Sequence, residues 1–108
     1  MKVKAKEGKI ELPKLFKLFG STYNICIDNT VNDIKGTLGL FSVDDKEISL
    51  ATCVGLNELP SDTILDTYYH ELSHALVKNT GEEEYYKDEK FIDLLGKLLR
   101  QYVESVKY

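Results

Sequence analysis

The stretch His70-Glu71-Leu72-Ser73-His74 is the pattern from which we infer both the fold and the function of this chain. On a helix, residues four positions apart lie on the same face, so both imidazoles can bind one metal ion. The 108 residues contain only two histidines, and both belong to this pattern. We therefore expect a zinc site in which Glu71 acts as the general base. The alternative is a pair of surface histidines on an amphipathic helix without metal.

The residues around this motif have the pattern of a helix over 62–78. Ser61 or Asp62 is expected to cap its start, and Gly81 suits the left-handed geometry that follows many helix ends. Its apolar side chains fall on one arc of the helix: Ile64, Leu65, Tyr68, Leu72, Ala75 and Leu76. The two histidines lie on the opposite side, so we expect them to face away from the core that anchors this helix.

A second helix is predicted over 88–106, near the end of the sequence. Its apolar residues form two adjacent rows, which are Phe91, Leu95, Leu98 and Tyr102, and Ile92, Leu99, Val103 and Val106. The acidic segment 82–88 is expected to be a loop or the frayed start of this helix.

A catalytic zinc takes three protein ligands and leaves a fourth position for water. No third histidine exists, so the third ligand must be a carboxylate, Cys53 or water. We favour Glu89, because the preceding loop lets its helix fold back and Gly96 permits close helix packing. Asp93, one turn later, is expected to bond a histidine N–H. The neighbouring acids remain alternatives, as does a role for Glu89 as a residue favoured by the helix dipole in the first turn.

The first half of the chain has the alternating pattern of short strands. We expect two weak strands within 1–12, a hairpin over 15–28 (alternatively a short helix at 14–19), a polar loop over 29–35, a second hairpin over 36–53 and a loop over 55–60. The predicted fold is a single α+β domain over 1–108. A small, mostly antiparallel sheet packs in it against the two helices that carry the metal site.

Composition narrows the classes of function. The formal net charge of −4 argues against nucleic acid as a partner, and the lysine-rich first 17 residues are expected to form a solvated basic strand pair. No apolar run spans a membrane and no signal-peptide pattern is present, so a cytoplasmic location is expected. Cys26 and Cys53 are expected to be reduced, half-buried strand residues.

The expected chemistry is hydrolysis of an amide or peptide bond. Zinc lowers the pKa of a bound water, Glu71 takes the proton, and the leaving amine receives it. Tyr69, Tyr85 and Tyr86 are candidates to stabilise the developing oxyanion, with a structural role as the alternative for each.

Two stretches carry a resemblance to a known group of proteins. Residues 68–76 (YYHELSHAL) resemble the active-site helix of zincin metallopeptidases, and residues 89–96 (EKFIDLLG) resemble the E-x-x-A-N-x-F-A helix of the ImmA/IrrE-like branch. The chain is also similar to small phage-encoded zincin-like proteins, over about residues 14–105. The resemblance implies a gluzincin ligand set of His70, His74 and Glu89. It also implies a strand near 47–53 that pairs with extended substrate, and action in a bacterial host cytoplasm.

Two functions follow as expectations. The first is a minimal zinc-dependent metallopeptidase that acts on a protein or peptide substrate. The second is a catalytically silent zincin-fold binding module, in which zinc is structural or vestigial and a fourth protein ligand, Cys53 or Asp93, closes the site.

Overall fold

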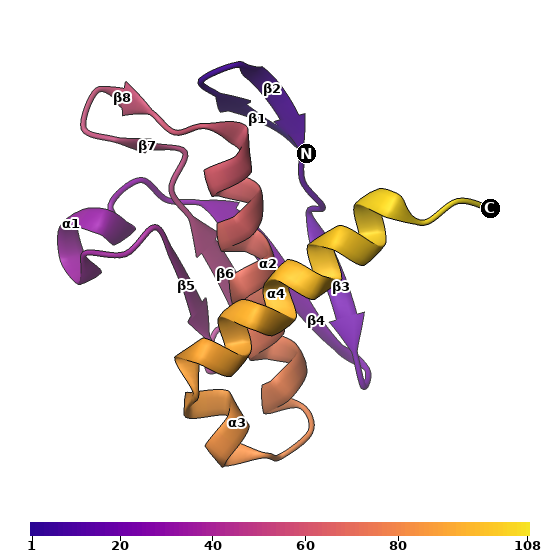
Figure 1. Ribbon diagram of the computed structural model, residues 1–108. Coiled ribbons are helices and arrows are strands. Elements are labelled where there is room, and N and C mark those ends of the chain that lie inside the picture. The colour runs from indigo at the N-terminus through magenta and orange to yellow at the C-terminus, as the bar shows by residue number, and fades with distance from the viewer.

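The computed structural model describes residues 1–108, which form an α+β fold, as predicted (Figure 1). The elements, in chain order, are β1 (Lys2–Ala5), β2 (Gly8–Glu11), β3 (Leu15–Leu18), β4 (Ser21–Ile27), α1 (Val31–Lys35), β5 (Gly39–Ser42), β6 (Glu47–Leu50), β7 (Cys53–Val54), β8 (Asn57–Glu58), α2 (Ser61–Lys78), α3 (Glu83–Lys87) and α4 (Glu89–Ser105).

The main sheet has four strands in the order β3-β4-β6-β5. The hairpins β3–β4 and β5–β6 are antiparallel, which confirms both predicted hairpins, whereas β4 and β6 pair in parallel, with Ile25 opposite Ile48. The hairpins β1–β2 and β7–β8 form two further small sheets. Strand β6 is therefore an interior strand, and β3 and β5 are the two edges.

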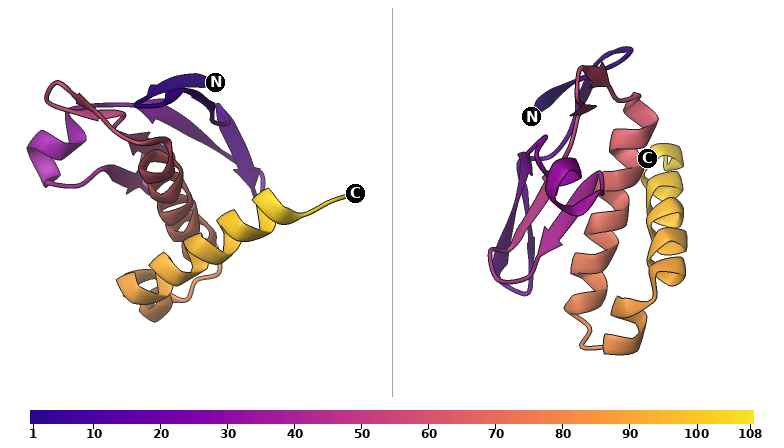
Figure 2. Two further views of the ribbon diagram at one scale, coloured as in Figure 1. Left: turned by 45° about the horizontal axis from the view of Figure 1, so that its top comes forward. Right: turned by 90° about the vertical axis from the view of Figure 1, so that its left-hand side faces the viewer.

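Three layers follow one another, and the side view of Figure 2 shows the sheet, then α2, then α4. Alternation in the strands turns Tyr23, Ile25 and Ile48 toward α2, and they form a core with Ile64 and Tyr68 of that helix. The β1–β2 hairpin adds its buried side chains to the same core. The central helix, between the sheet and α4, is buried on more than its predicted apolar arc: Glu71, Ser73 and Val77 are buried as well.

Two loop predictions and one strand prediction need correction. The polar segment 29–35 contains the short helix α1, with Gly36 in the left-handed conformation after it. The strand predicted over 47–53 stops at Leu50, and the chain then forms β7. The segment predicted as a loop over 55–60 includes β8, which pairs with β7. These pieces are too short for a periodic pattern to identify them.

The central helix starts at Ser61, one residue before the predicted start, and its end at Lys78 is confirmed. The predicted cap is wrong, because Pro60 holds the N-cap position and makes no side-chain bond. The Ser61 backbone N–H donates instead to Glu7 of the β1–β2 hairpin at 2.8 Å. Gly81 adopts the left-handed conformation (φ 79°), three residues after the helix ends.

The last helix, α4, starts at Glu89, and Asp88 caps it by accepting a hydrogen bond from the Phe91 N–H at 3.1 Å. Only Ile92 and Gly96 of this helix are buried. The predicted apolar rows are thus wrong toward the C-terminus, where Leu98 and Tyr102 are 54% and 62% exposed because no element packs over them. The segment before it, predicted as a loop or as the frayed start of this helix, contains the separate short helix α3.

Two further observations concern the chain as a whole. None of the helices combines the length and the apolar character that a membrane crossing requires. Cys26 and Cys53 are free and half-buried, as predicted.

Candidate metal centre

Two helices bring three potential metal ligands together. Glu89, the first residue of α4, extends its carboxylate between the two histidines of α2. Its Oε2 lies 2.9 Å from His70 Nε2, and its Oε1 lies 3.1 Å from His74 Nε2. One donor atom from each residue lies within 4.8 Å of the others. These three residues are therefore positioned to hold a metal ion.

The approach of the two helices depends on Gly96, as the sequence predicted. A Cβ atom at this position would lie 3.0 Å from the Tyr69 carbonyl oxygen and 3.1 Å from the His70 backbone nitrogen. Any side chain would therefore push α4 away from the backbone of the motif itself. The histidines face away from the sheet-side core, as expected, but they are not open to solvent: α4 and α3 cover them, and their side chains are 24% and 12% exposed.

The donor set fits a divalent cation. Ligands at about 2.1 Å around a tetrahedral metal are separated by about 3.4 Å, close to the separations between Glu89 and the two imidazoles. Two imidazoles and one carboxylate suit zinc and several other transition metals, so the donor set alone does not select the ion. The Nδ1 atom of His74 is buried without a hydrogen-bond partner, so the hydrogen bond that commonly orients a metal-binding imidazole is missing on this ring.

Glu71 lies beside this group and is only 9% exposed. Burial raises the pKa of its carboxyl to about 7, and the neighbouring charge of Glu89 acts in the same direction, while His70 opposes it. Burial also lowers the pKa of His74 and so favours the neutral imidazole that binds metals. A dication held beside Glu71 would favour its charged form and lower this pKa.

Asp93 lies close to the predicted position beside a histidine. Its Oδ1 is 3.6 Å from His70 Nδ1, which is longer than a hydrogen bond, and its Oδ2 is 2.8 Å from Lys97 Nζ. The hydrogen bond with Lys97 is the main cause of the lowered pKa of Asp93. The carboxylate is thus held by Lys97 and lies near the outer nitrogen of the imidazole.

The three candidate tyrosines differ in position. The Tyr86 ring packs edge-on against His74 with 5.2 Å between centroids, and Tyr86 lines the cavity at the site. Burial raises the pKa of its hydroxyl. Tyr69 packs on Tyr68, and Tyr85 packs on Phe91 at the surface; neither lines the cavity.

An open cavity of ≈ 740 Å³ lies over the histidines, Glu71 and Glu89, and its opposite wall is residues 37–41 of the β5 region. The resemblance implied that the strand near 47–53 flanks this cleft, which is wrong. Strand β6 is paired on both sides, by β4 and β5, so β5 is the edge strand beside the site.

Gly39 of β5 is a site residue that the sequence analysis missed. A Cβ atom there would lie 2.5 Å from Thr67 Cγ2 and 3.2 Å from Glu71 Cγ, so only glycine lets β5 pass this close to the base. A glycine within a strand pattern signals such an approach, but its partners on α2 are distant in sequence.

The other sequence candidates for metal binding are not part of this group. Cys53 is in β7, and Glu82, Glu83, Glu84 and Asp88 also lie outside the three-residue cluster. Comparison of the chain with protein-family models, with curated proteins and with solved structures found no match. The function must therefore be argued from the geometry of the site.

Proposed function

We propose that this chain is a zinc-dependent metallopeptidase that hydrolyses a peptide bond, with Glu71 as the general base. The observation that carries the proposal is the convergence of two imidazoles and one carboxylate beside a buried glutamate, at the base of an open cavity. His70, His74 and Glu89 would hold the ion. When bound, zinc supplies Lewis acidity, which makes water acidic and polarises the substrate carbonyl.

Glu71 has the environment of a group that accepts and returns a proton. Glu71 lines the cavity beside the three potential ligands, and a bound dication would favour the charged carboxylate that a base requires. The carboxylate would take a proton from the attacking water and deliver it to the leaving amine. We assign the hydrogen bond to the developing oxyanion to Tyr86, because it alone of the three candidates lines the cavity.

The edge of β5 suits an extended peptide. Its edge away from β6 borders the cavity, and an extended strand at such an edge gains main-chain hydrogen bonds regardless of its sequence. The Gly39 carbonyl accepts from the Thr37 hydroxyl at 2.8 Å and the Phe41 N–H donates to Glu71, so a bound peptide would exchange its own hydrogen bonds for these. We therefore place the substrate along residues 39–42, in place of the strand near 47–53 that the resemblance implied.

The alternative, a silent binding module with a structural zinc, would need a fourth protein ligand. The cluster of potential ligands contains only three residues. Asp93 does not join it, because Asp93 lies beside Nδ1 of His70, whereas Glu89 lies beside Nε2 on the other side of the ring. An open ligand position favours the catalytic function over the structural one.

The test compares the wild type with Glu71→Gln and with the control Glu84→Gln, an exposed acid on α3. We expect Glu71→Gln to retain stoichiometric zinc and to lose at least about 100-fold in the hydrolysis of a peptide library. The control should retain both properties. Hydrolysis that survives Glu71→Gln would exclude Glu71 as the base, and a zinc-loaded wild type that cleaves no peptide would favour the binding module.

A further inference from the structure

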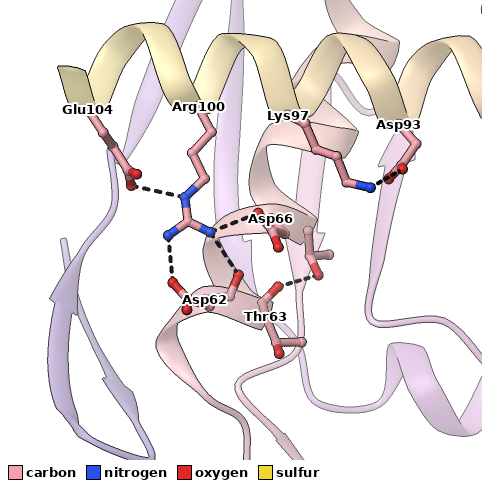
Figure 3. A network of polar contacts seen from close by, with 8 residues as sticks. Asp62, Thr63, Asp66, Asp93, Lys97, Arg100 and Glu104 are labelled. Atoms are coloured by element: carbon pink, nitrogen blue, oxygen red, sulfur yellow. Dashed lines mark hydrogen bonds and ion pairs between the residues drawn. The ribbon is translucent and has the colours of Figure 1, made fainter. Parts of the chain in front are cut away.

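A second polar cluster joins α2 and α4 at the end of the helix pair remote from Glu89 (Figure 3). The Arg100 side chain, only 17% exposed, points from α4 to the first turns of α2. Its NH2 atom donates to Asp62 Oδ1 at 2.7 Å, and its NH1 atom donates to Asp66 Oδ1 at 2.8 Å and to the Asp62 carbonyl at 3.2 Å. Its Nε donates to Glu104 at 2.9 Å.

Few other contacts hold the half of α4 that follows Gly96. The buried residues of the helix are Ile92 and Gly96, and apolar side chains beyond Gly96 such as Leu98 and Tyr102 are exposed. Fully buried apolar contacts are therefore confined to the half of α4 that is nearer to Glu89, and in the other half Leu99 is only partly buried. Arg100, whose three nitrogens all have partners, makes the polar contacts of that half with α2.

Because Arg100 and Glu89 lie on opposite sides of Gly96 along α4, a shift at Arg100 would also move Glu89. At 1.5 Å per residue, Glu89 lies about 10.5 Å before Gly96, and Arg100 lies about 6 Å after it. Gly96 is a point of close contact with α2, and it has no side chain to prevent rotation of one helix on the other. A movement at Arg100 about this point would be enlarged at Glu89 by the ratio of the two distances, roughly 1.8.

We propose that Arg100 is a positioning residue for the metal centre: by binding Asp62 and Asp66 it fixes the crossing of α4 over α2 and keeps the Glu89 carboxylate between the imidazoles. This inference rests on the metal binding in the proposed function but not on peptide hydrolysis. The carboxylate partners are 82%, 55% and 50% exposed, and such ion pairs add little to overall stability. The contribution of Arg100 should therefore appear in metal affinity.

The experiment is a double-mutant cycle on zinc affinity in the full chain, with Arg100→Met, Glu89→Gln and the double variant. We expect Arg100→Met to weaken zinc binding about 10-fold in the wild-type background. In the Glu89→Gln background the same change should alter affinity less than about twofold, because the ligand that Arg100 positions is gone. Arg100→Lys should recover part of the loss.

Lys107→Met is the matched control, since it removes one positive charge near the same end of α4 outside the cluster, and it should leave zinc affinity unchanged. The absorption spectrum of bound Co²⁺ provides a second readout, which should change in Arg100→Met and not in the control. An equal loss in both backgrounds, or a lowered melting temperature with unchanged affinity, would overturn the positioning role. A wild type that binds no zinc would overturn the metal centre itself, which is a separate result.

Discussion

The two polar clusters that join α2 to α4 are built in opposite ways. At one end a single carboxylate, Glu89, lies between two imidazoles, and His74 keeps a buried nitrogen without a partner. At the other end a single guanidinium lies among three carboxylates, and each nitrogen of Arg100 donates a hydrogen bond. The second cluster contains its own cation, whereas the first has the donor atoms for a cation that the chain does not supply. The Glu89 cluster thus has the composition of a metal site, whereas the Arg100 cluster has that of an ion-pair network between two helices.

The largest effect on metal binding should come from replacing one of the two histidines. His74→Ala should reduce the zinc content of the purified protein from one equivalent to none, because only two potential ligands remain. The measurement is metal analysis after gel filtration, with Glu84→Gln as the control. Undiminished zinc in His74→Ala would place the metal elsewhere in the chain.

The second effect concerns the pH dependence of stability in the presence of a chelator. Because burial raises the pKa of Glu71 from 4.5 to about 7, the folded protein retains a proton that the unfolded chain releases. Its contribution to stability is full below pH 4.5 and is lost as the pH rises to 7, by about 3 kcal/mol. The lowered pKa of His74 acts oppositely below pH 6.5, but both the wild type and Glu71→Gln contain this residue.

Urea unfolding of both proteins across this pH range measures the difference. The free energy of unfolding of the wild type should fall with pH relative to that of Glu71→Gln. Parallel curves would show that Glu71 titrates normally.

A smaller effect on stability and zinc affinity is expected from a substitution at Gly96, where α4 contacts α2. Gly96→Ala raises helix propensity, yet the added methyl meets backbone atoms of Tyr69 and His70 that cannot move aside. We expect the free energy of unfolding to fall by about 1–3 kcal/mol and zinc affinity to fall with it. A stabilised Gly96→Ala variant with unchanged zinc affinity would contradict the close contact at this position.

The smallest effect should come from an ion pair at the rim of the metal site. Lys97 and Asp93 are both mainly exposed, so Lys97→Met should change the melting temperature by no more than about 1 °C. Calorimetry with and without zinc checks this expectation. A large loss of stability would mean that this pair resembles the Arg100 cluster more than its exposure indicates.

Periodicity predicted the elements of the helical half of the molecule well. The helical pattern over 62–78 placed both ends of α2 to within one residue, and the need for a third ligand led to Glu89. The same pattern misjudged Leu98 and Tyr102, because spacing reports which residues share a face and not whether anything covers it. The partners of Arg100 lie 38 and 34 residues away, beyond any local pattern.

In the sheet, too, only the contacts that are local in sequence were predicted. Both hairpins are local and were predicted, but the parallel pairing of β4 with β6 joins them across α1 and decides which strand is the edge. Alternation of side chains determines the buried face of a strand and says nothing about its neighbours. The assignment of the cleft to the strand near 47–53 failed for this reason, and Gly39 went unnoticed with it.

The two edges of the sheet also differ in how they resist aggregation. The β3 edge has Pro13 and Lys14 before it and Lys17 within it, which are residues that discourage edge-to-edge association. The β5 edge, with the sequence Gly-Leu-Phe-Ser, has no charge and no proline, and its outer backbone groups are engaged only by the side chains of Thr37 and Glu71. An edge open to a peptide is open to any other exposed strand, so crowded or partly unfolded copies should associate first through β5.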